Sequence, residues 1–201
     1  MEDCYRTLTV SSEGSYREKG SKFLAFAYPV ASEDEVQACQ DELKKKFYDA
    51  RHHCYAFLLK PQEGQEETYR ASDDGEPAHS AGDPILGQIR SHQLQDVLIV
   101  VVRYFGGTKL GVSGLIHAYK TAAADAIANT NIVEKYIERS ISIEFEYIAT
   151  AGVTRIIDQY SLTILEQSFS ENCQFQLSAR LRDYHTVLSL LSDLDQVIVK
   201  H

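Results

Sequence analysis

Six consecutive apolar residues, most of them β-branched, occupy positions 97–102. A run of this length and composition is typical of a strand that is buried on both faces of a sheet. Gly106 and Gly107 end the strand, and apolar positions at helical spacing then predict a helix over 112–129. Its many alanines favour close packing of this helix on the sheet.

The rest of the first two thirds of the chain predicts more strands and two more helices. Ser32 followed three residues later by Glu35 forms a capping box, which predicts a helix that ends near Phe47. Pro84 is suited to the first turn of a short helix. The pattern predicts strands at 5–10, 22–30, 52–59 and 67–71 and helices at 32–47 and 84–91.

The last third of the chain has a separate pattern. Apolar and polar residues alternate over 141–147 and 175–181, which predicts strands with one buried face and one solvated face. The complete order is strand, helix, strand, strand, helix, strand, with Asp183 as the expected cap of the second helix. This βαββαβ order is ferredoxin-like. We therefore predict an α+β protein of two domains, residues 1–135 and 136–201.

Composition and charge exclude several classes of protein. The 201 residues include 29 Asp and Glu against 20 Lys and Arg, a net charge of −9. A bulk basic surface for nucleic acid is absent, so any such contact needs a local positive patch. No apolar run is long enough to span a bilayer, so we expect a cytoplasmic protein with no membrane partner. The four cysteines form no C-x-x-C pair, so neither a disulfide framework nor a zinc site is expected.

The glycine-rich segment after the buried strand is the first candidate site. It reads Arg103-Tyr104-Phe105-Gly106-Gly107-Thr108-Lys109-Leu110-Gly111 and opens the predicted helix. Free N–H groups at such a corner bind anions, and Arg103 and Lys109 add charge. Gly106 and Gly111 have the spacing of a Walker motif, but Val112 and Ser113 follow where the motif needs Lys and Ser/Thr, and no G-x-G-x-x-G is present. The alternatives are a tight strand-to-helix turn and a site for an anion or a nucleic-acid backbone.

The second candidate is the acidic segment Ser72-Asp73-Asp74-Gly75-Glu76-Pro77. Asp-Gly next to Pro is typical of a turn on the surface. The carboxylates are also suited to a hard cation such as magnesium, or to general acid and base catalysis. A third alternative is that these acids pair with Arg103 or Lys109 if the two segments meet.

The third candidate is His52-His53-Cys54 on a predicted strand. Adjacent side chains on a strand point to opposite faces, so His52 and His53 are not expected to bind one metal ion together. Cys54 shares a face with His52, but no residue that would orient a Cys–His nucleophile is apparent. We favour a half-buried strand with hydrogen-bonded histidines.

These three segments, together with Ala81-Gly82, resemble the YigZ/IMPACT family. The resemblance implies an N-terminal α/β sandwich like the second domain of a small-subunit ribosomal protein and domain IV of elongation factor G. It implies that the C-terminal domain is similar to domain V of that factor. Eukaryotic relatives act as translation regulators that bind an activator of an initiation-factor kinase. Binding to RNA or the ribosome is implied by analogy of fold alone.

The chain departs from the family pattern at a few positions. His79, Ser80 and Asp83 stand where the family often has a Gly-Thr pair and a lysine, and Val112-Ser113 follow Gly111 where Thr-Gly is common. Asp83 thus removes a positive charge near the candidate site, which weakens a phosphate-binding interpretation.

Three functions are compatible with these observations. We favour a non-catalytic binding or regulatory protein linked to translation through RNA, the ribosome or a protein partner. The alternatives are a scaffold using the exposed sheet face of the C-terminal domain, and a small-substrate or metal-dependent enzyme with no catalytic residues assigned. No cofactor or bound metal is expected, and the oligomeric state is open. The predicted binding residues are Asp73, Asp74, Gly75, Glu76, Arg103, Tyr104, Phe105, Gly106, Gly107, Lys109, Gly111 and His53.

Overall fold

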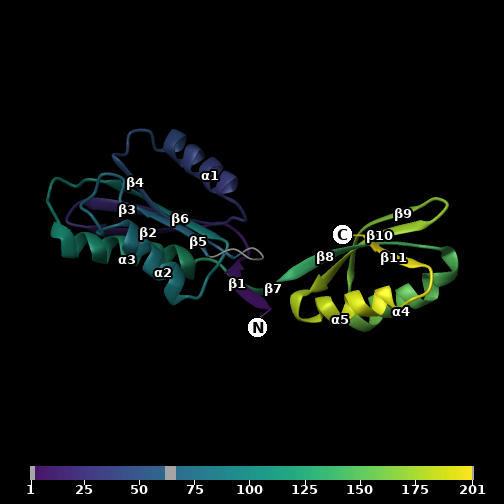
Figure 1. Ribbon diagram of the computed structural model, residues 1–201. Coiled ribbons are helices and arrows are strands. Elements are labelled where there is room, and N and C mark those ends of the chain that lie inside the picture. Colours follow the sequence, from purple (N-terminus) through teal and green to yellow (C-terminus); the bar gives the residue numbers. More distant parts are fainter. Residues whose placement is uncertain (1–2, 62–66, 201) are drawn as a thin grey trace. The chain divides into compact units, whose positions relative to one another are not determined.

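The computed structural model describes residues 3–61 and 67–200, which separate into two compact units (Figure 1). One unit comprises residues 5–134, and the other comprises the described residues from 135 onward together with 3 and 4. Strands β1 (Cys4–Leu8) and β7 (Ile132–Tyr136) pair in a two-stranded sheet. No helix within the described ranges combines the length and apolar character needed to cross a membrane.

The larger unit is built on a five-stranded antiparallel sheet with helices on both faces (Figure 1). Helix α1 (Glu33–Lys46) covers one face, and α2 (Gly82–Ser91) and α3 (Gly111–Ala128) cover the other. The strand order is β2 (Ser12–Glu18), β3 (Ser21–Pro29), β6 (Val97–Tyr104), β4 (His52–Leu59) and β5 (Thr68–Ser72).

The central strand β6 contributes to two hydrophobic cores. Val97, Ile99 and Val101 pack in the core that includes residues of α2 and α3, whereas Leu98, Val100 and Val102 pack in the core on the α1 side. All six side chains are essentially inaccessible to solvent. The predicted strand with two buried faces is therefore confirmed.

Local signals in the sequence account for most of this unit. Helix α1 begins after Ser32, whose hydroxyl accepts a hydrogen bond from the Glu35 N–H, as a capping box requires. Strand β4 has the predicted limits of 52–59. Strand β2 was not predicted, because its residues are mostly polar and half-exposed. It forms by pairing with β3 and packing against α3, where Gly14 lets the two backbones touch.

The smaller unit has a four-stranded antiparallel sheet in the order β11-β8-β10-β9, which confirms the ferredoxin-like arrangement. Asp183 does not cap its second helix as predicted: α5 begins at Leu181, and Asp183 lies inside its first turn. The elements are β8 (Glu138–Phe145), the 3-10 turn Tyr147–Ala149, α4 (Thr150–Tyr160), β9 (Thr163–Phe169), β10 (Cys173–Arg180), α5 (Leu181–Ser192) and β11 (Val197–Lys200).

Candidate functional site

The acidic segment 72–77 forms a turn that is anchored to strand β4. Asp74 and Gly75 both adopt positive φ angles, 41° and 84°, which is the left-handed geometry that Asp and Gly tolerate best. The Asp74 carboxylate accepts a hydrogen bond of 2.6 Å from the backbone N–H of His53. The ring Nδ1 of His52 donates to the Asp74 carbonyl at 2.8 Å. Asp74, Gly75 and His52 thus hold the turn in place.

Asp73 acts as a remote cap for helix α2. Its carboxylate accepts hydrogen bonds from the N–H groups of His79, Ala81 and Gly82 at 2.8–2.9 Å. The helix has no local side-chain cap, so a residue eight positions upstream satisfies its free N–H groups. Partial burial opposes ionisation of Asp73, but these three N–H groups outweigh it and lower its pKa.

We expect Asp73→Ala to lower the free energy of unfolding by about 2 kcal/mol, near the upper end for the loss of a helix cap. Because its folded-state pKa lies below the ordinary value of 3.8, the stabilisation by Asp73 is present above that pH. It is lost as the pH falls through the lowered value. Urea unfolding at pH 7 and in acid measures both effects. Asp41→Asn on the exposed surface of α1 is the control, and an equal effect of both substitutions would contradict the capping role.

Glu76 and Arg103 form a buried ion pair that joins the acidic turn to the end of β6. Arg103 Nη1 lies 2.5 Å from Glu76 Oε1, and the two side chains are only 7% and 4% exposed. The hydroxyl of Tyr119 on α3 donates to the same carboxylate oxygen at 2.8 Å. The ion pair corresponds to the third alternative given for the acidic segment, in which one of its acids pairs with Arg103.

Cys54 and Tyr119 complete this network beneath the turn. The Cys54 Sγ lies 3.0 Å from the Asp73 carbonyl oxygen and 3.2 Å from the Tyr119 hydroxyl. Burial raises the pKa of the Cys54 thiol and of the Tyr119 hydroxyl, so both stay protonated. A buried, protonated thiol is a poor nucleophile. Tyr119 was not predicted as part of the site, because its position in the apolar stripe of α3 indicates only a core residue.

The other predicted binding residues are divided between two faces of the sheet. Tyr104 points to the α1 side, where its hydroxyl donates to Asp49 at 2.8 Å. His53 also lies on that side of β4, and burial lowers the pKa of its ring. Phe105 is 57% exposed at the corner. Gly107, Lys109 and Gly111 are exposed as well.

The corner 105–111 is held against the turn between β2 and β3. A Cβ atom added to Gly106 would lie 1.9 Å from the carbonyl carbon of Gly20. The N–H of Gly106 also donates to the Ser21 hydroxyl at 3.1 Å. This contact places Arg17, Lys19 and Lys22 next to the candidate site, and no motif marks these three residues. The only signal was the glycine of a two-residue turn, Lys19-Gly20, in which both φ angles are positive.

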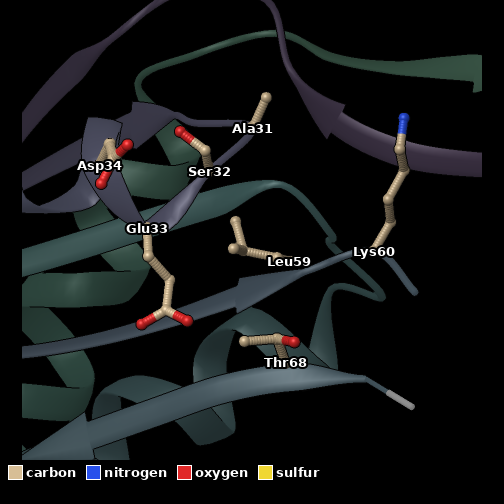
Figure 2. Close-up of a pocket in the computed structure, with 7 residues that line it drawn as sticks. All are labelled: Ala31, Ser32, Glu33, Asp34, Leu59, Lys60 and Thr68. Carbon is tan, nitrogen blue, oxygen red and sulfur yellow. The ribbon is translucent and has the colours of Figure 1, made fainter. Parts of the chain in front are cut away.

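Neither the departures from the family pattern nor the hollow at the start of α1 adds an anion site. His79 Nδ1 lies 2.6 Å from Asp83, and the Ser80 hydroxyl donates to the Pro77 carbonyl at 2.6 Å. A separate hollow of about 290 Å³ lies at the start of α1, with Glu33 on one side and Lys60 on the other (Figure 2). Over residues 3–61 and 67–200, no group of three or more His, Cys, Asp or Glu side chains is arranged to hold a metal ion.

The architecture therefore defines a two-domain α+β protein with a buried charged network beneath an exposed glycine-rich corner. The model of the Impact N-terminal domain matches residues 19–127, which is more than half of the chain. This range includes all three motifs. An IMPACT family member from Haemophilus influenzae is 34% identical over 77% of this chain and 74% of that protein. The chain belongs to the IMPACT family.

Other relatives extend the similarity to both units. The IMPACT family member YvyE of Bacillus subtilis is 27% identical over 94% of this chain and 86% of its own length. The family member YigZ of Escherichia coli is 30% identical over 75% of this chain and 74% of its own. The crystal structure of a hypothetical protein aligns with a TM-score of 0.71 over 99% of this chain and 97% of that one, at 23% identity, and so has the same fold.

Proposed function

We propose that this protein is a non-catalytic binding protein with a regulatory role in translation, and that it binds a component of the translation machinery through the corner 103–111. The observation that carries this proposal is the exposed aromatic ring of Phe105, which lies next to the guanidinium group of Arg103 in the buried ion pair. Phe105 is 57% exposed, and the guanidinium carbon of Arg103 lies 5.6 Å from the centre of its ring. Such a ring is available to stack on an unpaired base.

Family membership supports the link to translation, since the resemblance to the IMPACT family implies translation regulation for its eukaryotic relatives. The analogy of the N-terminal fold to ribosomal and elongation-factor domains, and of the C-terminal unit to domain V, stays part of this proposal. Residues 73–76 were predicted to bind directly; in this proposal Glu76 instead supports the corner through its ion pair with Arg103.

The contacts of the acidic residues argue against the alternative of a small-substrate enzyme. The Asp73 carboxylate is engaged by three backbone N–H groups, and that of Asp74 is engaged by one. Glu76 is buried against Arg103 and Tyr119. These contacts give each carboxylate a structural role, so acid–base or metal chemistry has no support from their geometry.

The proposal is tested by co-sedimentation of the full chain with ribosomes and with ribosomal RNA at 50 and 200 mM salt. We expect association at low salt that weakens as salt rises, because phosphate contacts depend on salt. Phe105→Ala reduces the bound fraction, whereas Tyr69→Ala, which removes a tyrosine that is 52% exposed at the opposite end of the sheet, leaves it unchanged. No association at 50 mM salt would overturn the proposal.

A further inference from the structure

The turn between β2 and β3 carries an uncompensated positive charge. Arg17, Lys19 and Lys22 lie within six residues, and Glu18 is the single acid among them. Residues 17–22 line a hollow of about 380 Å³. In the described part of the chain, no ion pair within 4.0 Å involves any of these three cations, whereas Lys46, Lys60, Arg90 and Lys200 each pair with a carboxylate. In a chain of net charge −9, such a group is a local positive patch.

Backbone contact joins this turn to the glycine-rich corner. Gly20 and Gly106 approach so closely that a Cβ on either would lie within 2.8 Å of the other's backbone. Lys22 is directly opposite Tyr104 in the β3–β6 ladder, one residue before Phe105. Both loops lie at the same end of the sheet in Figure 1. The three cations, Lys109 and the exposed ring of Phe105 are therefore gathered at one end of the sheet on a fixed backbone, with Lys22 on the side of Tyr104 and Phe105 beside Arg103.

We propose that this area, the hairpin–corner surface formed by Arg17, Lys19, Lys22, Phe105 and Lys109, binds single-stranded RNA. The cations contact successive phosphates, and Phe105 stacks on a base. Positive charge alone would also suit an acidic protein, but an exposed aromatic ring at the same end of the sheet as cations without an ion pair is the combination typical of sites for single-stranded nucleic acid. This inference rests on the proposed function and names the ligand and the additional residues that hold it.

The charge contribution is tested by fluorescence anisotropy with a labelled 20-nucleotide poly(U) RNA between 50 and 200 mM salt. The full chain is compared with the triple variant Arg17→Gln, Lys19→Gln and Lys22→Gln. Each lost phosphate contact reduces the slope of log K against log salt by about 0.7 for a single strand, so the slope falls by about 2. The control variant, Arg70→Gln, Lys135→Gln and Arg155→Gln, removes the same charge from exposed positions on β5, β7 and α4 and leaves the slope unchanged.

The aromatic contribution is tested with Phe105→Ala and Phe105→Tyr in the same assay. The loss of one base–aromatic stack weakens binding by about five- to 160-fold in the alanine variant, whereas the tyrosine variant keeps the affinity of the unchanged protein. The salt slope stays the same in both, because no charge is changed. A structural role for Phe105 would instead lower the melting temperature of the alanine variant, which is measured in parallel.

Several outcomes would overturn the inference. They are an unchanged slope in the hairpin triple variant, an equal effect of the control triple variant, and no effect of Phe105→Ala on binding. Tighter binding of poly(Glu) than of poly(U) would indicate an acidic protein partner instead.

If the wild-type protein co-sediments with ribosomes and the hairpin triple variant co-sediments equally well, the hairpin–corner surface is wrong and the proposed function still holds. If the wild-type protein does not co-sediment at low salt, the proposed function itself fails.

Discussion

Replacing Glu76 with alanine is expected to lower the free energy of unfolding by about 3–5 kcal/mol, because it leaves the Arg103 guanidinium buried without a countercharge. Arg103 is 6% exposed, and its Nε already has no hydrogen-bond partner among the described residues. Tyr119 would also lose the acceptor of its hydroxyl. Urea denaturation at pH 7, followed by circular dichroism, measures the change.

The matched control is Glu67→Ala, which breaks an ion pair of similar length at the surface. Arg90 Nη2 lies 2.8 Å from Glu67 Oε1, but the two side chains are 48% and 39% exposed. Exposed pairs contribute about 0–1 kcal/mol, so this substitution has little effect. The double variant Glu76→Leu with Arg103→Met recovers much of the stability, because neither charge is then buried alone. Equal costs for Glu76→Ala and Glu67→Ala would contradict a buried, mutually dependent pair.

Gly106→Ala is expected to destabilise the protein by about 3 kcal/mol, at the upper end for overpacking of a fixed contact. The added Cβ would lie 1.9 Å from one backbone atom of Gly20 and 2.2 Å from the amide nitrogen of Ser21. Backbone atoms cannot rotate away as a flexible side chain can, so strands β3 and β6 must shift apart.

Gly87→Ala gives the opposite result and serves as the control for Gly106→Ala. Gly87 lies inside helix α2, and an added Cβ would meet nothing within 4 Å. Alanine in an exposed helical position stabilises by about 0.5–1 kcal/mol relative to glycine. Thermal unfolding measures both variants. A stabilising or neutral Gly106→Ala would show that the hairpin and the corner are free to move apart.

The elements with strong local signals were predicted well from the sequence. The apolar run in β6, the capping box of α1 and the alternation in β10 each predict their element, because each of these patterns is formed by residues close together in the sequence. Strand β2 lacked such a signal. Its stability comes from pairing with β3 and from contact with α3, more than a hundred residues away in sequence.

The motifs of the candidate site were visible in the sequence, but their spatial relation was only a hypothesis. The meeting of Glu76 with Arg103 is now an observed contact, whereas Lys109 points to solvent and His53 and Tyr104 face the other side of the sheet. Alternation along a strand explains this division: Arg103 and Tyr104 are consecutive in β6 and must point in opposite directions.

The order of residues was enough to establish two α+β domains, the family and the segments at which to look, because periodicity, caps and motifs are properties of neighbouring residues. It could not establish which carboxylate would be buried, which aromatic ring would be exposed, or that the β2–β3 turn would lie against the glycine corner. Those outcomes depend on contacts such as Gly20 with Gly106 and Glu76 with Arg103, which form only when distant strands pair and exclude water between them.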